Sequence, residues 1–161
     1  MMIHLCSELL AALNGRTFST AESCTGGGIG ATFTAVPGSS AAYKGGIISY
    51  TNWVKENLLG VPTEILATKG AVSEETARAM AVGVRKQLRT TMAVSVTGIA
   101  GPDSDEFRTP VGTVYIGYAD SKTAYAKKFF FEGNRELIRN QATRAALEML
   151  LRECTGEGDA S

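Results

Sequence analysis

The stretch TFSTAESCTGGGIGATF, residues 17–33, decides the fold of this chain. Its first six residues are typical of a short strand, and a helix is predicted from about residue 27 to residue 35. Between them, four glycines occupy five positions, next to the hydroxyl groups of Ser23 and Thr25. Glycine clusters occur where a backbone bends sharply or approaches another group closely. The stretch therefore predicts a strand–turn–helix unit whose turn is a binding loop, the turn of a nucleophile, or only a tight connection.

The glycine loop lacks the partners that the common nucleotide-binding loops require. The run from Gly26 to Ala31 formally fits the dinucleotide fingerprint, which also needs an acidic residue about 20 positions later. No Asp or Glu occurs between residues 23 and 55, and the loop has no lysine for a Walker A motif. Two interpretations remain: its N–H groups and neighbouring hydroxyls hold one phosphate or carboxylate, or it is a tight turn that packs the helix on the sheet.

Hydrophobic periodicity and turn residues predict the other elements. Helices are expected over 2–14, about 27–35, from Ser73 to about 88, and over about 134–153, and strands over 17–22, 45–51, 92–101, 111–119 and 123–131. The apolar stripes of the helices are Ile3, Cys6, Leu9, Leu10 and Leu13, then Ala77, Met80, Ala81, Val84 and Leu88, and last Leu137, Ile138, Ala142, Ala145, Met149 and Leu150. Helices between the strands, together with one hairpin, predict a three-layer α/β/α sandwich with a mixed sheet. We expect one domain over residues 1–161, with a disordered tail from about 155 to 161.

Composition excludes several functional classes. Sixteen basic residues balance sixteen acidic ones, so no overall field would recruit nucleic acid or an anionic membrane surface. No apolar run approaches the roughly 20 residues of a membrane span. Three scattered cysteines without C-x-x-C spacing suggest reduced thiols. We expect a soluble, cytoplasmic domain that binds neither nucleic acid nor membrane.

The residue types present restrict the possible catalytic chemistry. The one histidine, His4, lies on the first helix, so Ser-His-Asp, Cys-His and histidine-based zinc sites are disfavoured. A serine nucleophile would then need a lysine as its base, and Lys44 and Lys55 both follow the GSS turn at 38–40. The acidic run at 103–106 is interpreted as a solvated loop. We expect neither a metal nor a cofactor.

Six motifs, in this order along the chain, together resemble one family. They are TAESCTGG (20–27), VPGSSAAYKGGIISYTNWVK (36–55), LLGVP (58–62), GAVSEETA (70–77), VSVTGIAGPD (94–103) and PVGTVYIG (110–117). They resemble the C-terminal domain of the competence/damage-inducible CinA proteins over about residues 3–153. This family includes stand-alone nicotinamide-nucleotide amidohydrolases. The resemblance implies hydrolysis of the carboxamide of nicotinamide mononucleotide to nicotinate mononucleotide and ammonia, in pyridine-nucleotide salvage. It also implies a homodimer.

The resemblance also assigns candidate site residues. It implies Ser40 as nucleophile, Lys55 as base and Tyr50 as an orienting or proton-relaying group, with Ser23 as the alternative nucleophile. The residues expected to bind substrate are Thr25, Gly26, Gly27, Thr97, Gly98, Gly101, Arg139 and Arg144. Of these, Thr25, Gly26 and Gly27 would hold the phosphate, or the oxyanion if Ser23 is the attacking group. Thr109 stands where relatives often carry a lysine, and Arg108 is a candidate to replace that charge. The competing interpretation is a catalytically silent nucleotide-binding or interaction module linked to competence or DNA-damage responses.

Overall fold

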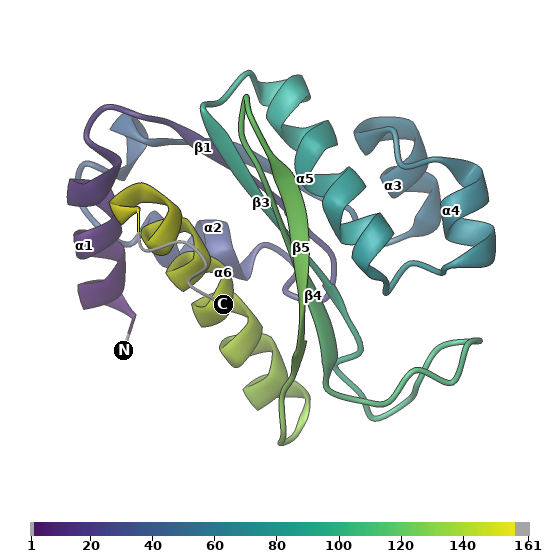
Figure 1. Ribbon diagram of the computed structural model, residues 1–161. Helices are drawn as coiled ribbons and strands as arrows, with labels where there is room; N and C mark the ends of the chain where they lie inside the picture. Colours follow the sequence, from purple (N-terminus) through teal and green to yellow (C-terminus); the bar gives the residue numbers. More distant parts are fainter. Residues whose placement is uncertain (1, 157–161) are drawn as a thin grey trace.

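A single mixed sheet organises the chain in the computed structural model, which describes residues 2–156 (Figure 1). Its strands are β1 (Phe18–Glu22), β2 (Tyr43–Ile48), β3 (Met92–Gly98), β4 (Thr113–Ala119) and β5 (Ala124–Phe130), in the order β2-β1-β3-β4-β5. β1 runs parallel to β2 and to β3, whereas β4 and β5 continue the sheet antiparallel. The carboxyl ends of β1, β2 and β3 therefore meet at one edge of the sheet.

Helices cover both faces of this sheet, which confirms the predicted three-layer α/β/α sandwich. α1 (Ile3–Leu13), α2 (Gly28–Phe33) and α6 (Arg135–Thr155) form one layer, and α3 (Asn52–Leu59), α4 (Thr63–Thr68) and α5 (Glu74–Leu88) form the other. A short 3-10 turn, η1 (Ser39–Ala41), leads into β2. The larger hydrophobic core lies between the sheet and the α1–α2–α6 layer, and a smaller one lies beneath α5.

Two close backbone approaches seat the α5 layer. A Cβ atom at Gly117 of β4 would overlap the carbonyl oxygen of Ala77, so α5 lies directly on the sheet there. A Cβ atom at Gly83 would overlap the carbonyl oxygen of Leu59, so the end of α3 packs directly on α5. Ser73 caps α5 as predicted, since its Oγ accepts a hydrogen bond from the amide of Thr76 at 3.2 Å. These contacts fix the position of α3 relative to the carboxyl edge of the sheet.

Helices α3 and α4 were not predicted. The strand expected over 45–51 ends at Ile48, and the Thr51 hydroxyl caps α3 by accepting a hydrogen bond from the amide of Val54. Both helices are short, and neither carries a full apolar stripe, so periodicity had little to detect. They acquire their stability from packing on α5.

Some residues expected to face inward lie at the surface. Ile3 and Leu137 are about half exposed, at 51% and 52%. Both stand at the first turn of their helices, beyond the layer that buries the later turns. Leu10 and Ala145 are half-buried, and the other members of these two stripes are buried. α6 ends at Thr155, and residues 157–161 of the tail that was expected to be disordered lie outside the described residues.

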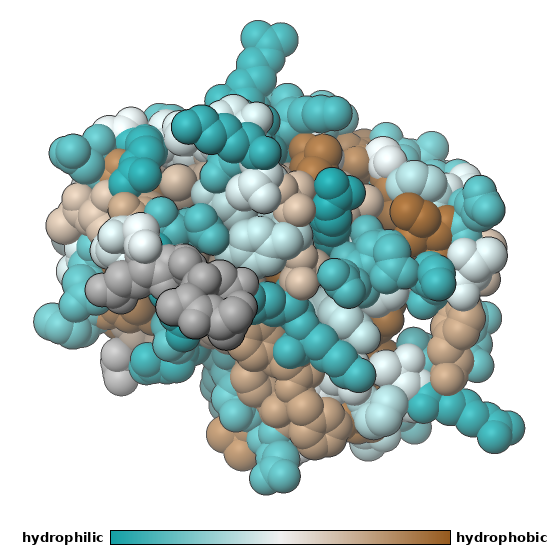
Figure 2. Space-filling model, in the orientation of Figure 1, coloured by the Kyte–Doolittle hydropathy of each residue, from teal (hydrophilic) through white to brown (hydrophobic). Residues whose placement is uncertain are grey.

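The visible face of the molecule is mostly hydrophilic, with hydrophobic residues in separate patches (Figure 2). Within residues 2–156, no helix is long and apolar enough to cross a membrane.

Candidate active site

Ser23 and Lys55 meet at the carboxyl edge of the parallel strands. Ser23 follows β1 directly, and Ser49 follows β2 and donates its amide to the carbonyl of Glu22 at 2.8 Å. From the second turn of α3, the Lys55 side chain reaches back over this edge. Its Nζ lies 3.0 Å from Ser23 Oγ and 2.6 Å from the carbonyl oxygen of Ser49. A serine hydroxyl, an amine and an acceptor that orients the amine thus form one chain of hydrogen bonds.

Burial alters the acid–base properties of this pair. Lys55 is 1% exposed and Ser23 is 9% exposed. Desolvation lowers the pKa of Lys55 from 10.5 to about 8, because a buried ammonium loses its hydration. The neighbouring Cys24 thiol is buried as well, which raises its pKa to about 11 and keeps it uncharged near neutrality. No carboxylate within residues 2–156 forms an ion pair with Lys55, and the Cys24 thiol, whose negative form would raise the pKa of Lys55, has a smaller effect than desolvation.

Glu22 occupies the place where the sequence predicted a bound phosphate. Its buried carboxylate accepts hydrogen bonds from the amides of Ile29 at 2.8 Å and Gly30 at 3.1 Å, at the start of α2. The Thr25 hydroxyl also donates to it, at 2.6 Å. The prediction that this helix start and Thr25 hold phosphate is therefore wrong, because the protein's own carboxylate already satisfies those donors. The signal in the sequence was an acid four residues before the first glycine of the loop.

The glycines of the loop leave backbone donors beside Ser23. Gly26 and Gly27 adopt φ angles of 59° and 102°, which favour glycine. The amides of Thr25 and Gly27 donate no hydrogen bond to any acceptor in residues 2–156, whereas the Cys24 amide interacts with its own thiol. Free N–H groups close to a nucleophile are the usual components of an oxyanion hole.

Ser40 lies at the other end of β2. It is an exposed residue of η1, before Tyr43, which pairs with the first residue of β1. Lys55 lies beyond Ile48, which pairs with the last residue of β1. At about 3.3 Å per residue, the length of β2 alone separates the two by about 17 Å. The preferred Ser40–Lys55 pair is therefore not formed within the chain, and the alternative serine, Ser23, is the one that contacts Lys55.

Two arginines of α6 bind the loops around the Ser23–Lys55 pair. Arg139 donates from Nε to the carbonyl of Cys24 at 3.0 Å and from Nη2 to that of Thr25 at 3.3 Å. Arg135, one turn earlier, donates to the carbonyl of Gly101 at 2.7 Å and to the Tyr50 hydroxyl at 3.1 Å. Sequence reasoning missed Arg135. The signal was its spacing of four residues from Arg139, which places both on one helix face.

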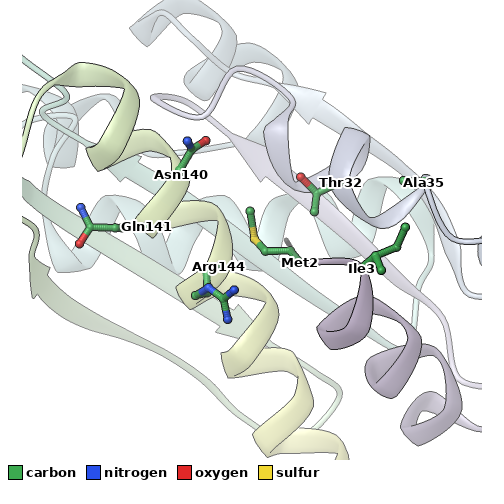
Figure 3. A pocket seen from close by; sticks show the side chains of 7 residues that line it. All are labelled: Met2, Ile3, Thr32, Ala35, Asn140, Gln141 and Arg144. Carbon is green, nitrogen blue, oxygen red and sulfur yellow. The ribbon is translucent and has the colours of Figure 1, made fainter.

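Arg144, in contrast, belongs to another part of the surface. It lies five residues after Arg139, or about 140° around the helix. It lines a pocket of about 490 Å³ between α6, the start of α1 and the end of α2, together with Met2, Ile3, Thr32, Ala35, Asn140 and Gln141 (Figure 3). The expectation that Arg144 reaches a phosphate bound at the glycine loop is therefore not met.

The residues expected to form the opposite wall have structural contacts. The buried Thr97 hydroxyl donates to the carbonyl of Ala71 at 2.7 Å, and a Cβ atom at Gly98 would lie 2.9 Å from a carbonyl oxygen of β4. Asp105 accepts hydrogen bonds from the amide and hydroxyl of Thr109, both at 2.9 Å, so this acid closes a turn. Within residues 2–156, no group of three Asp, Glu, His or Cys residues is arranged to hold a metal ion.

Comparison with known proteins identifies relatives along the whole domain. Residues 2–154 match the family described as the CinA C-terminal domain. A CinA-like protein of Solibacter usitatus is 49% identical over 141 residues, which are 88% of this chain and 34% of the relative. One of Citrifermentans bemidjiense is 46% identical over 144 residues, which are 89% of this chain and 35% of the relative. The chain thus spans about a third of the length of these curated relatives.

Solved structures agree with the fold. A competence-damaged protein (CinA) superfamily protein from Klebsiella pneumoniae superposes with a TM-score of 0.93 at 31% identity, covering 97% of this chain and 99% of the other. The competence/damage-inducible protein CihA from Agrobacterium tumefaciens gives a TM-score of 0.89 at 40% identity, covering 93% of each chain.

Proposed function

The chain belongs to the family of CinA C-terminal domains, and we propose that it is an amidohydrolase in which Ser23 is the nucleophile and Lys55 the general base. Its proposed substrate is nicotinamide mononucleotide, whose carboxamide it would hydrolyse to give nicotinate mononucleotide and ammonia. The names of the relatives state no enzymatic activity. The proposed substrate therefore rests on the resemblance of the sequence motifs to those of the family. The observation that carries the catalytic part is the 3.0 Å contact between Lys55 Nζ and Ser23 Oγ in a buried setting.

Lys55 has the properties that a base for serine requires. An amine accepts a proton only when it is neutral, and a pKa of about 8 leaves roughly a tenth of it neutral at pH 7. The carbonyl of Ser49 accepts one N–H of the neutral amine and thereby turns its lone pair toward the Ser23 hydroxyl. This carbonyl has the orienting role that the third member of a catalytic triad usually fills.

The reaction follows from this arrangement. Lys55 takes the proton from Ser23 as Oγ attacks the amide carbon, and the oxyanion forms beside the free amides of Thr25 and Gly27. Protonated Lys55 then gives its proton to the leaving nitrogen, and the C–N bond breaks. Ammonia departs, and the acyl group remains bound to Ser23 as an ester. Water, deprotonated by Lys55, attacks this ester, and the proton returns to Ser23 as the acid is released. One amide and one water become one carboxylic acid and one ammonia.

Ammonia release from purified protein and nicotinamide mononucleotide tests the proposal. Ser23→Ala and Lys55→Ala should each reduce kcat by at least about 10²–10⁴-fold, and the double variant should be hardly worse, because the pair acts as a unit. Lys55→Arg should also be inactive, because arginine stays protonated. Ser40→Ala and Lys44→Ala are the matched controls and should stay within about twofold of wild type.

Two outcomes would overturn the proposal. Loss of activity in Ser40→Ala with retention in Ser23→Ala would assign the nucleophile to η1, which would then have to act from a second copy of the chain. Absence of ammonia release from the folded wild-type protein would favour the catalytically silent binding module.

A further inference from the structure

The cations that remain available near Ser23 belong to the first two turns of α6. The start of α2 is neutralised by Glu22, and Arg144 lines a separate pocket. Lys55 is committed to Ser23 and Ser49. Arg135 and Arg139 contact the residues around this pair directly, through Tyr50 and through the carbonyls of Cys24 and Thr25.

Both guanidinium groups retain unused donors and uncompensated charge. A guanidinium has five N–H donors, and each of these two arginines uses only two of its five nitrogen-bound hydrogens on protein acceptors. All four acceptors are neutral: three are carbonyl oxygens and one is a phenol. Within residues 2–156, no carboxylate lies within ion-pair distance of either group. Two arginines four residues apart are neighbours on one helix face, about 6 Å apart along the axis.

We propose that Arg135, together with Arg139, forms an anion subsite beside the Ser23–Lys55 pair that binds the phosphate of a phosphate-monoester substrate. Planar guanidinium groups bind phosphate oxygens in pairs, and such charge-assisted hydrogen bonds are the stronger ones. Arg135 is the member to replace, because replacing Arg139 would also release the carbonyls of Cys24 and Thr25 and so disturb the loop that carries the nucleophile. The inference rests on the proposed function for the identity of the substrate, but the anion site itself can be tested without turnover.

The first experiment measures selectivity. The ratio of kcat/KM for nicotinamide mononucleotide to that for nicotinamide riboside is compared in wild type, Arg135→Gln and Arg135→Lys. Arg135→Gln also releases Tyr50, so both efficiencies should fall, but the ratio should drop at least tenfold. Arg135→Lys should keep part of the preference, because it keeps the charge but loses the planar fork. Arg152→Gln, an exposed arginine near the end of α6, is the control and should leave the ratio unchanged.

The second experiment uses inorganic phosphate, which distinguishes the free ion from the substrate's own phosphate. Phosphate should inhibit hydrolysis of the nucleotide competitively and should not inhibit hydrolysis of the riboside, which leaves the subsite empty. In thermal unfolding, phosphate at ten times its Kd should raise the Tm of wild type and Arg152→Gln by about 3 °C more than that of Arg135→Gln. The comparison between variants removes the general stabilisation by phosphate as an excluded salt.

These readouts separate the two proposals. Phosphate stabilisation that depends on Arg135, in a protein that hydrolyses neither compound, would leave the subsite standing and overturn the amidase. Hydrolysis with an unchanged nucleotide-to-riboside ratio in Arg135→Gln would overturn the subsite and leave the amidase standing. Equal phosphate stabilisation of wild type and Arg135→Gln would overturn the subsite as well.

Discussion

Replacement of Lys55 by methionine should change the free energy of unfolding in a pH-dependent way. The variant-minus-wild-type difference should be more favourable to the variant at low pH than at high pH. Methionine fills a similar volume without a charge, and Lys55 is buried at 1% exposure. The substitution also leaves the Ser49 carbonyl without its donor, at a cost of about 1–3 kcal/mol. That cost does not change with pH. The pH-dependent part of the difference therefore reports the ammonium of Lys55 alone.

The magnitude follows from the lowered pKa. Lys55 has a pKa of about 8 in the folded chain against an ordinary 10.5 in the unfolded one. At 1.36 kcal/mol per pKa unit, the charged form is disfavoured in the folded state by about 3 kcal/mol. Below about pH 7 both states are protonated and the folded wild type bears the whole penalty. As pH rises from about 8 towards 10.5, the folded chain releases this proton first, so wild-type stability increases.

The assay is urea unfolding of wild type and Lys55→Met at pH 6.5 and 9.5. The variant-minus-wild-type difference in the free energy of unfolding should fall by about 2 kcal/mol between these pH values, since the penalty is then only partly relieved. The other titrating groups are common to both proteins and cancel in the difference, except Cys24, whose pKa the Lys55 charge lowers in wild type alone. The kcat/KM of wild type should rise with pH through an apparent pKa of about 8 and then level off.

A difference between the two proteins that stays constant from pH 6.5 to 9.5 would refute the reasoning. It would mean that Lys55 titrates alike in the folded and unfolded chains, so that burial does not prepare it as a base. A rate profile with its midpoint above pH 10 would lead to the same conclusion.

Two further predictions concern Glu22 and metal ions. Glu22→Gln should lower the free energy of unfolding by about 2–4 kcal/mol, because the new amide nitrogen would face the buried backbone amides that now donate to the carboxylate. The control Glu136→Gln, at the exposed start of α6, should change the free energy of unfolding by less than about 0.5 kcal/mol. Equal urea midpoints for the two variants would contradict the role of Glu22 as the acceptor for these amides. Ammonia release should survive dialysis against EDTA, and a loss that a divalent ion restores would contradict the absence of a metal ligand set in residues 2–156.

The βα unit at residues 17–33 was predictable because its signals are local. A short strand-forming run, the glycine cluster and a helix-forming run lie within 17 residues, and β1 and α2 form there. The same holds for α5, where a capping serine, two acids in the first turn and an apolar stripe agree. α3 and α4 escaped prediction because their short helices are stabilised by contacts with α5 rather than by their own pattern.

The choice between the two candidate serines could not be made from the sequence. Ser40 is closer to Lys55 along the chain than Ser23 is, with 15 residues between their numbers against 32. The parallel pairing of β1 with β2 reverses this order in space, since it brings the end of β1 beside the end of β2 and leaves Ser40 at the start. Separation along the chain is a poor guide to distance in space where strands run parallel, because the connection between two such strands runs back along their full length.

The sequence by itself determined the layered α/β architecture, the prediction against histidine-based catalysis and the choice of lysine as the candidate base, because each depends on residue types and local periodicity. Only the tertiary structure decided which serine Lys55 contacts, that Glu22 fills the anion position at α2, and that Arg135 reaches Tyr50 from the far end of the chain. The Ser23–Lys55 and Tyr50–Arg135 contacts join segments 32 and 85 residues apart, and the burial that lowers the pKa of Lys55 exists only once the layers have packed.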